Sequence, residues 1–340
     1  MRLVSDTLLA LLSGVLLGLA FPPVDWKWLA WVGLFPLLVV IDRCQRPRQA
    51  FLLGYLAGFL FFLITLHPLA SAHAWTGWAV ESQAQFAARL GRQWWFLHGV
   101  WVSFALWGAV FWGTWAMVVR ARAEDPSWRR LCLLPSVWIV LCEWLRAKTT
   151  FGFTWAFLGY ATTDVFVLRQ LAALGGVWGL SALVVLVNAG AAELMRAGRT
   201  TVSGWRVIAV VVGCVGLAVG YGIMRRPVVD SSVPVAVLQY AKTTYALGDF
   251  LPIGLDQTYP RMIQQSLGRK ARLLVLPESI ALGAMSLDGS VSPTKPKDRV
   301  TTRAQWDGAF RGWLKESDAV VVLGLDTVEA SRDYNTLVAW

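Results

Sequence analysis

The stretch that decides the fold is Arg272-Leu-Leu-Val-Leu-Pro-Glu278-Ser279, a short apolar run that ends in a carboxylate. Its aliphatic residues, closed by a proline, predict a strand. An α/β sheet presents its reactive groups just beyond the carboxyl ends of its strands, so Glu278 is a candidate catalytic residue. The alternative is that this carboxylate only caps a neighbouring helix or pairs with an arginine.

The residues around this strand predict the beginning of an α/β domain. Gly283–Arg299 is rich in Ser, Pro and Gly and is predicted to be a loop near the site. Mostly polar segments between apolar runs predict helices. The predicted strands are Val233–Leu238, Leu273–Leu276, Ala319–Leu325 and Tyr334–Trp340, and the predicted helices are Pro252–Gly268 and Thr302–Glu316.

The preceding two thirds of the chain predict a membrane domain. Hydrophobic residues make up 56% of the sequence, and 20 of its residues are Trp, more than an ordinary soluble domain carries. Short apolar runs gain length from flanking Trp, Thr or Ser at the membrane interface. Residues 1–226 therefore predict about seven spans, at Thr7–Phe21, Trp28–Ile41, Phe51–Leu66, Trp94–Val119, Leu131–Leu141, Leu171–Ala192 and Val207–Ile223.

The arginines predict the orientation, because Lys and Arg in short loops stay on the cytoplasmic side. With the amino terminus inside, seven crossings leave everything after Met224 outside. The net charge of +10 then reflects topology and not nucleic-acid binding, although a basic patch that binds anionic lipid is an alternative. The arginines gather at the start and in every second connection: Arg2; Arg43, Arg46 and Arg48; Arg120, Arg122, Arg129 and Arg130; Arg196, Arg199 and Arg206.

The sequence predicts no metal site and no cofactor. Buried membrane Cys behaves as a small hydrophobe, and no Cys lies in the α/β part. The relevant residues match no zinc or disulfide spacing: Cys44, Cys132, Cys142, Cys214, His67, His73 and His98.

Two features of the membrane domain are candidates for substrate binding. Glu143 and Arg146, at i and i+3 within one span, predict an intramembrane ion pair near the interface, but intramembrane charges are also functional candidates. Gly152 and Trp155 belong to an outward loop that is either an entry for lipid or an interfacial aromatic anchor.

Tryptophans of the fourth predicted span form a third feature of the membrane domain. They either line a groove for an acyl chain or pack the helix against its neighbours and lipid. They are Trp94, Trp95, Trp101, Trp107, Trp112 and Trp115.

Several motifs in one order along the chain resemble the bacterial apolipoprotein N-acyltransferases. The loop motif departs at Thr154, where the family commonly has Pro. The motifs are Leu19-Ala-Phe-Pro-Pro-Val-Asp25, Gly54-Tyr-Leu-Ala-Gly58, Glu143-Trp-Leu-Arg146, Gly152-Phe-Thr-Trp155, Gly159-Tyr160, Gly175-Gly-Val-Trp-Gly-Leu-Ser181, Val237-Leu-Gln239, Leu276-Pro-Glu-Ser279, Leu323-Gly-Leu-Asp326 and Tyr334-Asn335-Thr336.

The resemblance implies a multi-pass protein of the bacterial inner membrane. A membrane helical domain would be followed by a linker, residues 227–233, and by the first part of a nitrilase-like αββα domain, residues 234–340, outside the membrane. The implied partners are the membrane, a phospholipid acyl donor similar to phosphatidylethanolamine, and a diacylated apolipoprotein acceptor; nucleic acid is not among them.

The implied reaction is acyl transfer in two steps. A cysteine thiolate takes an acyl chain from the phospholipid as a thioester, and the thioester acylates the α-amine of a diacylglyceryl-cysteine. Glu278 matches the family's general base, but the family's lysine and cysteine would follow after Trp340. The 340 residues are therefore expected to be an inactive fragment. The alternatives are a membrane-anchored carbon–nitrogen hydrolase and a non-catalytic lipid-binding scaffold.

Overall fold

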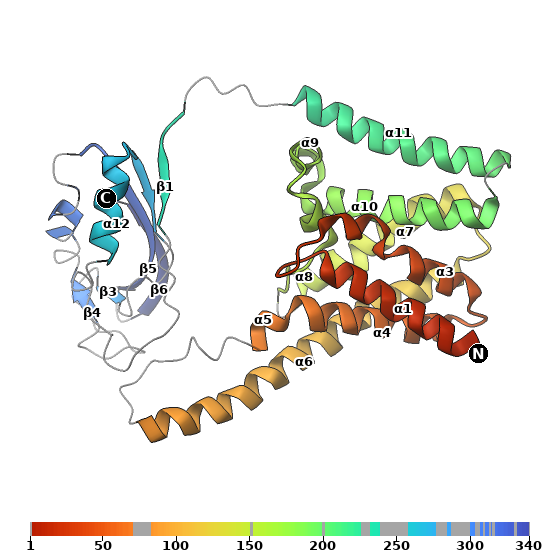
Figure 1. The fold of residues 1–340 in the computed structure, drawn as a ribbon, viewed down its shortest axis with the longest axis horizontal. Coiled ribbons are helices and arrows are strands. Elements are labelled where there is room, and N and C mark those ends of the chain that lie inside the picture. The colour runs from red at the N-terminus through yellow and green to blue at the C-terminus, as the bar shows by residue number, and fades with distance from the viewer. Residues whose placement is uncertain are drawn as a thin grey trace. The chain divides into compact units, whose positions relative to one another are not determined.

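The computed structural model describes residues 2–70, 83–149, 152–198, 201–225, 232–238, 258–276, 284–286, 300–302, 307–308, 310–312, 314, 317–329 and 332–339. These residues form two compact units, one of helices and one built on a β-sheet (Figure 1).

The helical unit contains every apolar stretch predicted to be a span. Three of these stretches are interrupted: the second is divided between short helices, the fifth passes through a π-helical turn, and the sixth has a kink at Gly176. The elements are α1 (Arg2–Leu19), η1 (Lys27–Leu29), α2 (Ala30–Gly33), α3 (Phe35–Arg43), α4 (Pro47–Thr65), α5 (His67–Ala70), α6 (Gln83–Ala121), α7 (Ser127–Trp138), η3 (Ile139–Leu145), α8 (Arg146–Lys148), η4 (Leu158–Thr162), α9 (Phe166–Arg169), α10 (Ala172–Ala197) and α11 (Val202–Met224).

Four helices of the described residues are long and apolar enough to cross a membrane. They are α4, the part of α6 from Trp94 to Ala121, α10 and α11. The apolar part of α1, Leu3–Leu19, is shorter. The chain is thus a multi-pass membrane protein, while the number of seven crossings stays a prediction.

Helix α6 is longer than a bilayer requires. Its 39 residues span about 58 Å at the α-helical rise, against roughly 30 Å of hydrocarbon. The apolar part, Trp94–Ala121, accounts for 28 of the 39 residues.

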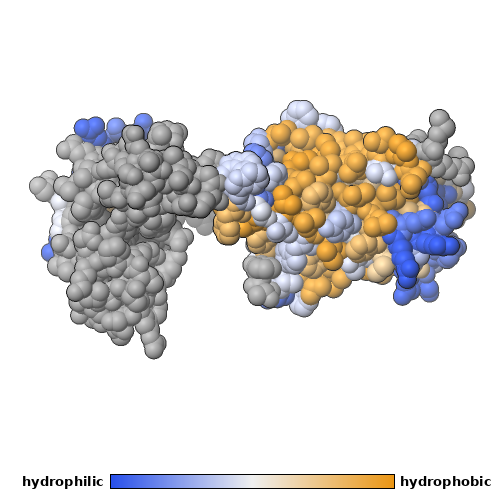
Figure 2. Space-filling view, turned by 90° about the horizontal axis from the view of Figure 1, so that it is seen from below, coloured by the Kyte–Doolittle hydropathy of each residue, from blue (hydrophilic) through white to orange (hydrophobic). Residues whose placement is uncertain are grey.

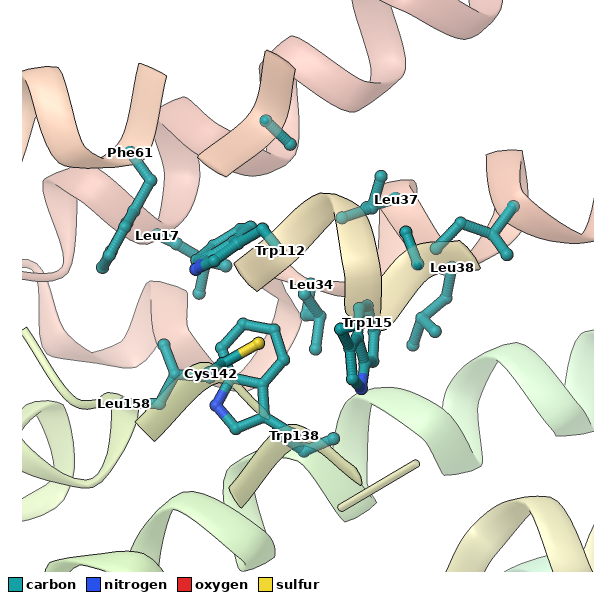
Figure 3. Packing of buried hydrophobic residues seen from close by; sticks show 14 of the residues in the cluster. Leu17, Leu34, Leu37, Leu38, Phe61, Trp112, Trp115, Trp138, Cys142 and Leu158 are labelled. Carbon is teal, nitrogen blue, oxygen red and sulfur yellow. The ribbon is translucent and has the colours of Figure 1, made fainter. Parts of the chain in front are cut away.

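Large aromatic side chains fill the centre of the helical unit (Figure 3). Trp112 and Trp115 of α6 lie against Trp138 of α7, each pair with ring centroids 5.0 Å apart, and Trp112 stacks on Phe61 of α4 at 4.8 Å. The indole N–H of Trp115 donates to the Leu134 carbonyl at 3.2 Å. For these two tryptophans the structure agrees with the packing alternative, because both are buried in the core.

Helices α1 and α4 approach each other closely because small residues face the contact. A Cβ atom on Gly14 would lie 2.4 Å from the carbonyl oxygen of Ala57. Small residues are the usual means by which membrane helices pack tightly, since lipid offers no hydrophobic gain for their association.

A buried amide holds the break between α2 and α3. The Oδ1 atom of Asn188 on α10 accepts hydrogen bonds from the backbone N–H groups of Leu34 and Phe35, both at 3.0 Å. Its Nδ2 donates to the carbonyls of Ala30 (3.0 Å) and Val184 (2.9 Å). In a membrane interior, backbone groups freed by a helix break need such partners.

Charged residues collect at one end of the helical unit, whereas apolar residues cover its flank (Figure 2). The buried Arg130 of α7 contacts Glu193 of α10 at 2.6 Å and Asp42 of α3 at 2.7 Å. Glu193 also forms an ion pair with Arg196, with 2.7 Å between Oε2 and Nη2. This charge network, Asp42, Arg130, Glu193 and Arg196, ties three helices together at that end.

The second unit is built on a six-stranded sheet with the order β1-β2-β5-β3-β4, and β6 pairs with β5. Buried apolar residues pack helix α12 against the sheet, with Ile263, Leu274, Phe310 and Val321 among them. The elements are β1 (Val235–Val237), α12 (Thr258–Gly268), β2 (Leu273–Val275), β3 (Ala284–Ser286), β4 (Val300–Thr302), β5 (Val320–Glu329) and β6 (Arg332–Ala339).

All four predicted strands are present, but the predicted loop at 283–299 contains β3 and is wrong there. Pairing with β5 explains this, because β3 lies parallel to its second half, Asp326–Val328. The predicted helix Thr302–Glu316 begins too early, since Thr302 ends β4; residues 307–308 and 310–312 are helical. The remainder of that helix, and the part of the other predicted helix before Thr258, lie outside the described residues. The nitrilase-like αββα arrangement stays a prediction.

Replacing Asn188 by Ala tests the amide that holds the broken helix. The change leaves the N–H groups of Leu34 and Phe35 without their acceptor, and we expect the free energy of unfolding to fall by about 1–3 kcal/mol. Thermal unfolding in detergent measures the effect. Ser136→Ala is the control, since its exposed hydroxyl bonds only to its own helix at Cys132. Equal midpoints for both variants would contradict the role of Asn188.

Replacing Glu193 by Ala tests the buried charge network. Arg130 then keeps Asp42 and the carbonyl of Ala123 but loses its fully buried carboxylate partner, and breaking a buried pair from one side costs about 3–5 kcal/mol. We expect a large drop in the unfolding temperature, whereas Glu124→Ala, at an exposed site, changes it little. If the apolar double variant Arg130→Met with Glu193→Leu is no more stable than Glu193→Ala alone, the loss does not come from an unpaired arginine.

Candidate functional site

The sheet fixes both ends of the segment that carries Glu278. Residues Leu273–Val275 of β2 pair with Val320–Val322, and β3 pairs with Asp326–Val328, along the same strand β5. Val275 and Ala284 are nine residues apart, whereas the β5 residues that they pair with, Val322 and Asp326, are only four apart. The connection between β2 and β3 is therefore five residues longer than the matching stretch of β5. Glu278 belongs to it and lies outside the described residues.

In the helical unit, the two predicted intramembrane charges lie on an unusual helical turn. Pro135 interrupts the hydrogen-bond ladder of α7, and the π-helix η3 follows at Ile139. Such widened turns occur often at functional sites. Glu143 on η3 and Arg146 at the start of α8 are each only 1% exposed.

Arg146 does not pair with Glu143, so the predicted ion pair is wrong: among the described side chains, neither group has the other as an ion-pair partner. Instead, Nε of Arg146 donates to the Cys142 carbonyl at 2.9 Å and Nη1 to the Trp155 carbonyl at 2.8 Å. The guanidinium group lies among three aromatic rings, those of Phe62, Phe153 and Phe157, at 4.9–5.6 Å from their centroids. Backbone carbonyls and ring faces therefore make the direct contacts with the cation, while Glu143 acts on it through space.

Glu143 reaches the same segment of chain a few residues further on. Its Oε1 accepts hydrogen bonds from the Leu158 N–H at 3.0 Å and from the Trp138 indole at 3.2 Å. The Ser181 hydroxyl of α10 interacts with the same carboxylate and accepts the Gly159 N–H at 2.8 Å. Three consecutive anchors, Arg146, Glu143 and Ser181, thus hold the backbone at residues 155, 158 and 159.

The segment that these anchors hold has two backbone positions in the left-handed region. Gly152 has φ +53°, which glycine adopts freely, but Ala156 has φ +56°, which costs a residue with a Cβ of order 1–3 kcal/mol. Trp155, between them, leaves 52% of its surface exposed. The structure therefore places Gly152 and Trp155 on the surface of the helical unit and Glu143 and Arg146 beneath them.

Aromatic rings continue from this segment along α6. Phe153 lies 5.8 Å from Trp155, 5.1 Å from Phe104 and 6.2 Å from Trp107 between ring centroids, and Trp107 lies 5.1 Å from Phe111. The loop is therefore fixed to α6 by ring contacts as well as to η3 by hydrogen bonds.

Ionic contacts of Lys27, which we call the Lys27 clasp, join two connections that the predicted topology places at the same membrane surface. Lys27, after α1, donates to Asp164, before α9, and lies 3.4 Å from Asp25. The hydrogen bond to Asp164, together with the nearby Asp25, raises the pKa of Lys27 above its ordinary value. The lysine therefore stays charged and keeps both partners at physiological pH.

Sequence reasoning missed two members of this site. Ser181 follows a glycine-rich stretch and lies in a long apolar span. A polar residue among apolar ones is the sequence feature that could have marked it as a functional candidate. Nothing in the sequence marks Ala156 as left-handed. Across the part of the chain that the structure describes, no group of three or more His, Cys, Asp or Glu residues is placed to hold a metal ion.

Comparison with known proteins gives one consistent family. The model of the apolipoprotein N-acyltransferase N-terminal domain matches residues 13–190, just over half of the chain. Those residues include η3, α8, the Trp155 segment and Ser181.

Individual relatives agree with this match. An apolipoprotein N-acyltransferase of Gloeobacter violaceus is 35% identical over 206 residues, covering 60% of this chain and 37% of the relative. That of Geobacter metallireducens is 33% identical over 288 residues, covering 81% and 51%, and that of Chromobacterium violaceum is 28% identical over 290 residues, covering 82% and 50%. The chain thus spans about half or less of the length of these relatives. Its matched helical unit shows that the chain belongs to the apolipoprotein N-acyltransferase family.

Proposed function

We propose that the protein to which this chain belongs N-acylates the diacylglyceryl-cysteine at the amino terminus of apolipoproteins. The observation that carries the proposal is the family match over residues 13–190, together with the similarity of the Geobacter metallireducens enzyme across 81% of the chain. A multi-pass helical unit joined to a sheet unit suits a substrate pair that is embedded in a membrane but reacts at a polar head group.

We propose that the acyl donor is a phospholipid similar to phosphatidylethanolamine. In the first step a thiolate attacks the ester carbonyl of the phospholipid, a thioester forms, and the lysophospholipid leaves with the proton that the thiol lost. In the second step the α-amine attacks the thioester, an amide forms, and the thiol is restored. A base is needed twice, first for the thiol and then for the amine.

Glu278 is our proposed base in both steps. It follows β2 by three residues, and the register of β2 and β3 gives the intervening segment spare length for leaving the plane of the sheet. The four cysteines, at positions 44, 132, 142 and 214, all belong to the helical unit, so we assign none of them the role of the nucleophile.

The location that we propose is the bacterial inner membrane, with the amino terminus in the cytoplasm and the sheet unit outside. The charge network, Asp42, Arg130, Glu193 and Arg196, and the arginine-rich connections mark one end of the helical unit, and cations favour the cytoplasmic side. In this orientation residues 152–159, which include Trp155, and the Lys27 clasp lie at the outer surface of the inner membrane.

Replacing Glu278 by Gln in the full-length protein tests the base. The amide cannot accept a proton, so we expect thioester formation from phospholipid to fall by about 100-fold or more. Gel-shift detection of the acyl-enzyme measures the first step, and N-acylation of a diacylated lipopeptide measures the second. Asp318→Asn, at an exposed residue of the same unit, is the control. Acylation at the unaltered rate by the Glu278 variant would remove this residue from the mechanism.

Thiol labelling tests the orientation. Cysteines are introduced at Gln45, between α3 and α4, and at Arg169, at the end of α9, after Cys132 and Cys214 have been replaced by Ser. In intact spheroplasts we expect a membrane-impermeant maleimide to label the cysteine at position 169 alone, and both after permeabilisation. Labelling of position 45 in intact spheroplasts would reverse the topology.

A further inference from the structure

The strongest unassigned feature is the pairing of two buried charged side chains with one short piece of backbone. Arg146 donates to the carbonyl of Trp155, and Glu143 accepts the N–H of Leu158. The two contacts bracket Ala156, the residue with φ +56°. Both side chains are buried: Arg146 donates to two main-chain carbonyls, and Oε1 of Glu143 accepts the Leu158 N–H and the Trp138 indole.

We propose that Glu143 and Arg146 are positioning residues that hold residues 155–158 in one conformation. This conformation presents the indole of Trp155 to acyl-chain substrates at the outer surface of the inner membrane. This inference rests on the proposed function for the identity of the substrates. The hydrogen bonds from Arg146 to Trp155 and from Leu158 to Glu143, which we call the clamp, do not depend on the proposed function.

The chemistry of each residue fits its place in the clamp. The guanidinium group provides separate donors on one rigid fork, and Arg146 uses Nε for Cys142 on its own helix and Nη1 for Trp155 in the loop. A Lys ammonium has three donors on one nitrogen but lacks the planar fork whose separate nitrogens, Nε and Nη1, contact the two carbonyls here. Oε1 of Glu143 accepts from Leu158 and Trp138, and the Ser181 hydroxyl interacts with the same carboxylate. A Gln side chain keeps one acceptor oxygen for Leu158 and Trp138, and its NH2 group can donate to the Ser181 hydroxyl.

This difference separates positioning from a role of the charges themselves. If the residues position the loop, Glu143→Gln keeps the acceptor and Arg146→Lys loses the fork. If instead the negative and positive charges act on a substrate or a proton, Glu143→Gln fails and Arg146→Lys succeeds. The two conservative substitutions therefore predict opposite patterns.

Spin labelling measures the clamp without reference to activity. A nitroxide is attached to a cysteine replacing the exposed Thr154, with the exposed Cys132 and Cys214 replaced by Ser, and the chain is held in lipid nanodiscs. We expect an immobilised spectrum for the parent and for Glu143→Gln, and a mobile spectrum for Glu143→Ala, Arg146→Gln and Arg146→Lys. Glu124→Ala, at an exposed site elsewhere in the helical unit, is the control and should leave the spectrum immobilised. Equal mobility in all variants would overturn the proposal.

Acylation by the full-length protein provides the second measurement. Misplacement of a positioning loop costs about 10- to 100-fold in rate, so we expect that loss in kcat/KM for Glu143→Ala and Arg146→Lys and its recovery in Glu143→Gln. If the spectra change as expected but no version of the protein acylates a lipopeptide, the proposed function fails and the clamp stands. If Glu143→Gln is as inactive as Glu143→Ala while its spectrum stays immobilised, the charge acts directly and the positioning role is wrong.

Discussion

Polar groups inside the helical unit must find partners within the protein, and the rest of the structure depends on this constraint. The break between α2 and α3 exists because Asn188 supplies both an acceptor and a donor to it. The buried Arg130 is balanced by two carboxylates from different helices. Each partner comes from a helix distant in sequence, so satisfying these groups also determines which helices are neighbours.

The same constraint explains the conformation of the loop after α8. Its strained residue, Ala156, is flanked by hydrogen bonds to Arg146 and Glu143, and those side chains are buried because three phenylalanine rings and Trp138 surround them. Strain persists only where the surroundings over-determine a conformation. Here the anchors lie on a widened helical turn after a proline, so the geometry of η3 and that of the loop depend on each other.

Apolar runs predicted the helical segments and the four main strands of this chain, because hydropathy and periodicity report directly on burial. They did not predict partners. Glu143 and Arg146 are three residues apart and of opposite charge, which favoured an ion pair, yet the loop that follows offered backbone groups and ring faces that no local pattern reveals. Likewise, β3 has too few apolar residues to indicate a strand by itself, and only its pairing with β5 and β4 makes it one. The tryptophans of α6 could be placed on a helix from sequence, but their division between core and surface required the neighbouring helices.

The order of the buried partners along the chain has a consequence for how the protein is made. Helix α11, with a mean hydropathy of 2.4, can enter a bilayer by itself as it is synthesised. The segment from α7 to α8 carries the buried charged residues Arg130, Glu143 and Arg146, and charged side chains in a spanning segment are costly unless they find partners within the protein. Its partners Ser181 and Glu193 are on α10, which emerges from the ribosome later. The buried groups of the earlier segment are therefore fully satisfied only after the later helix has been made.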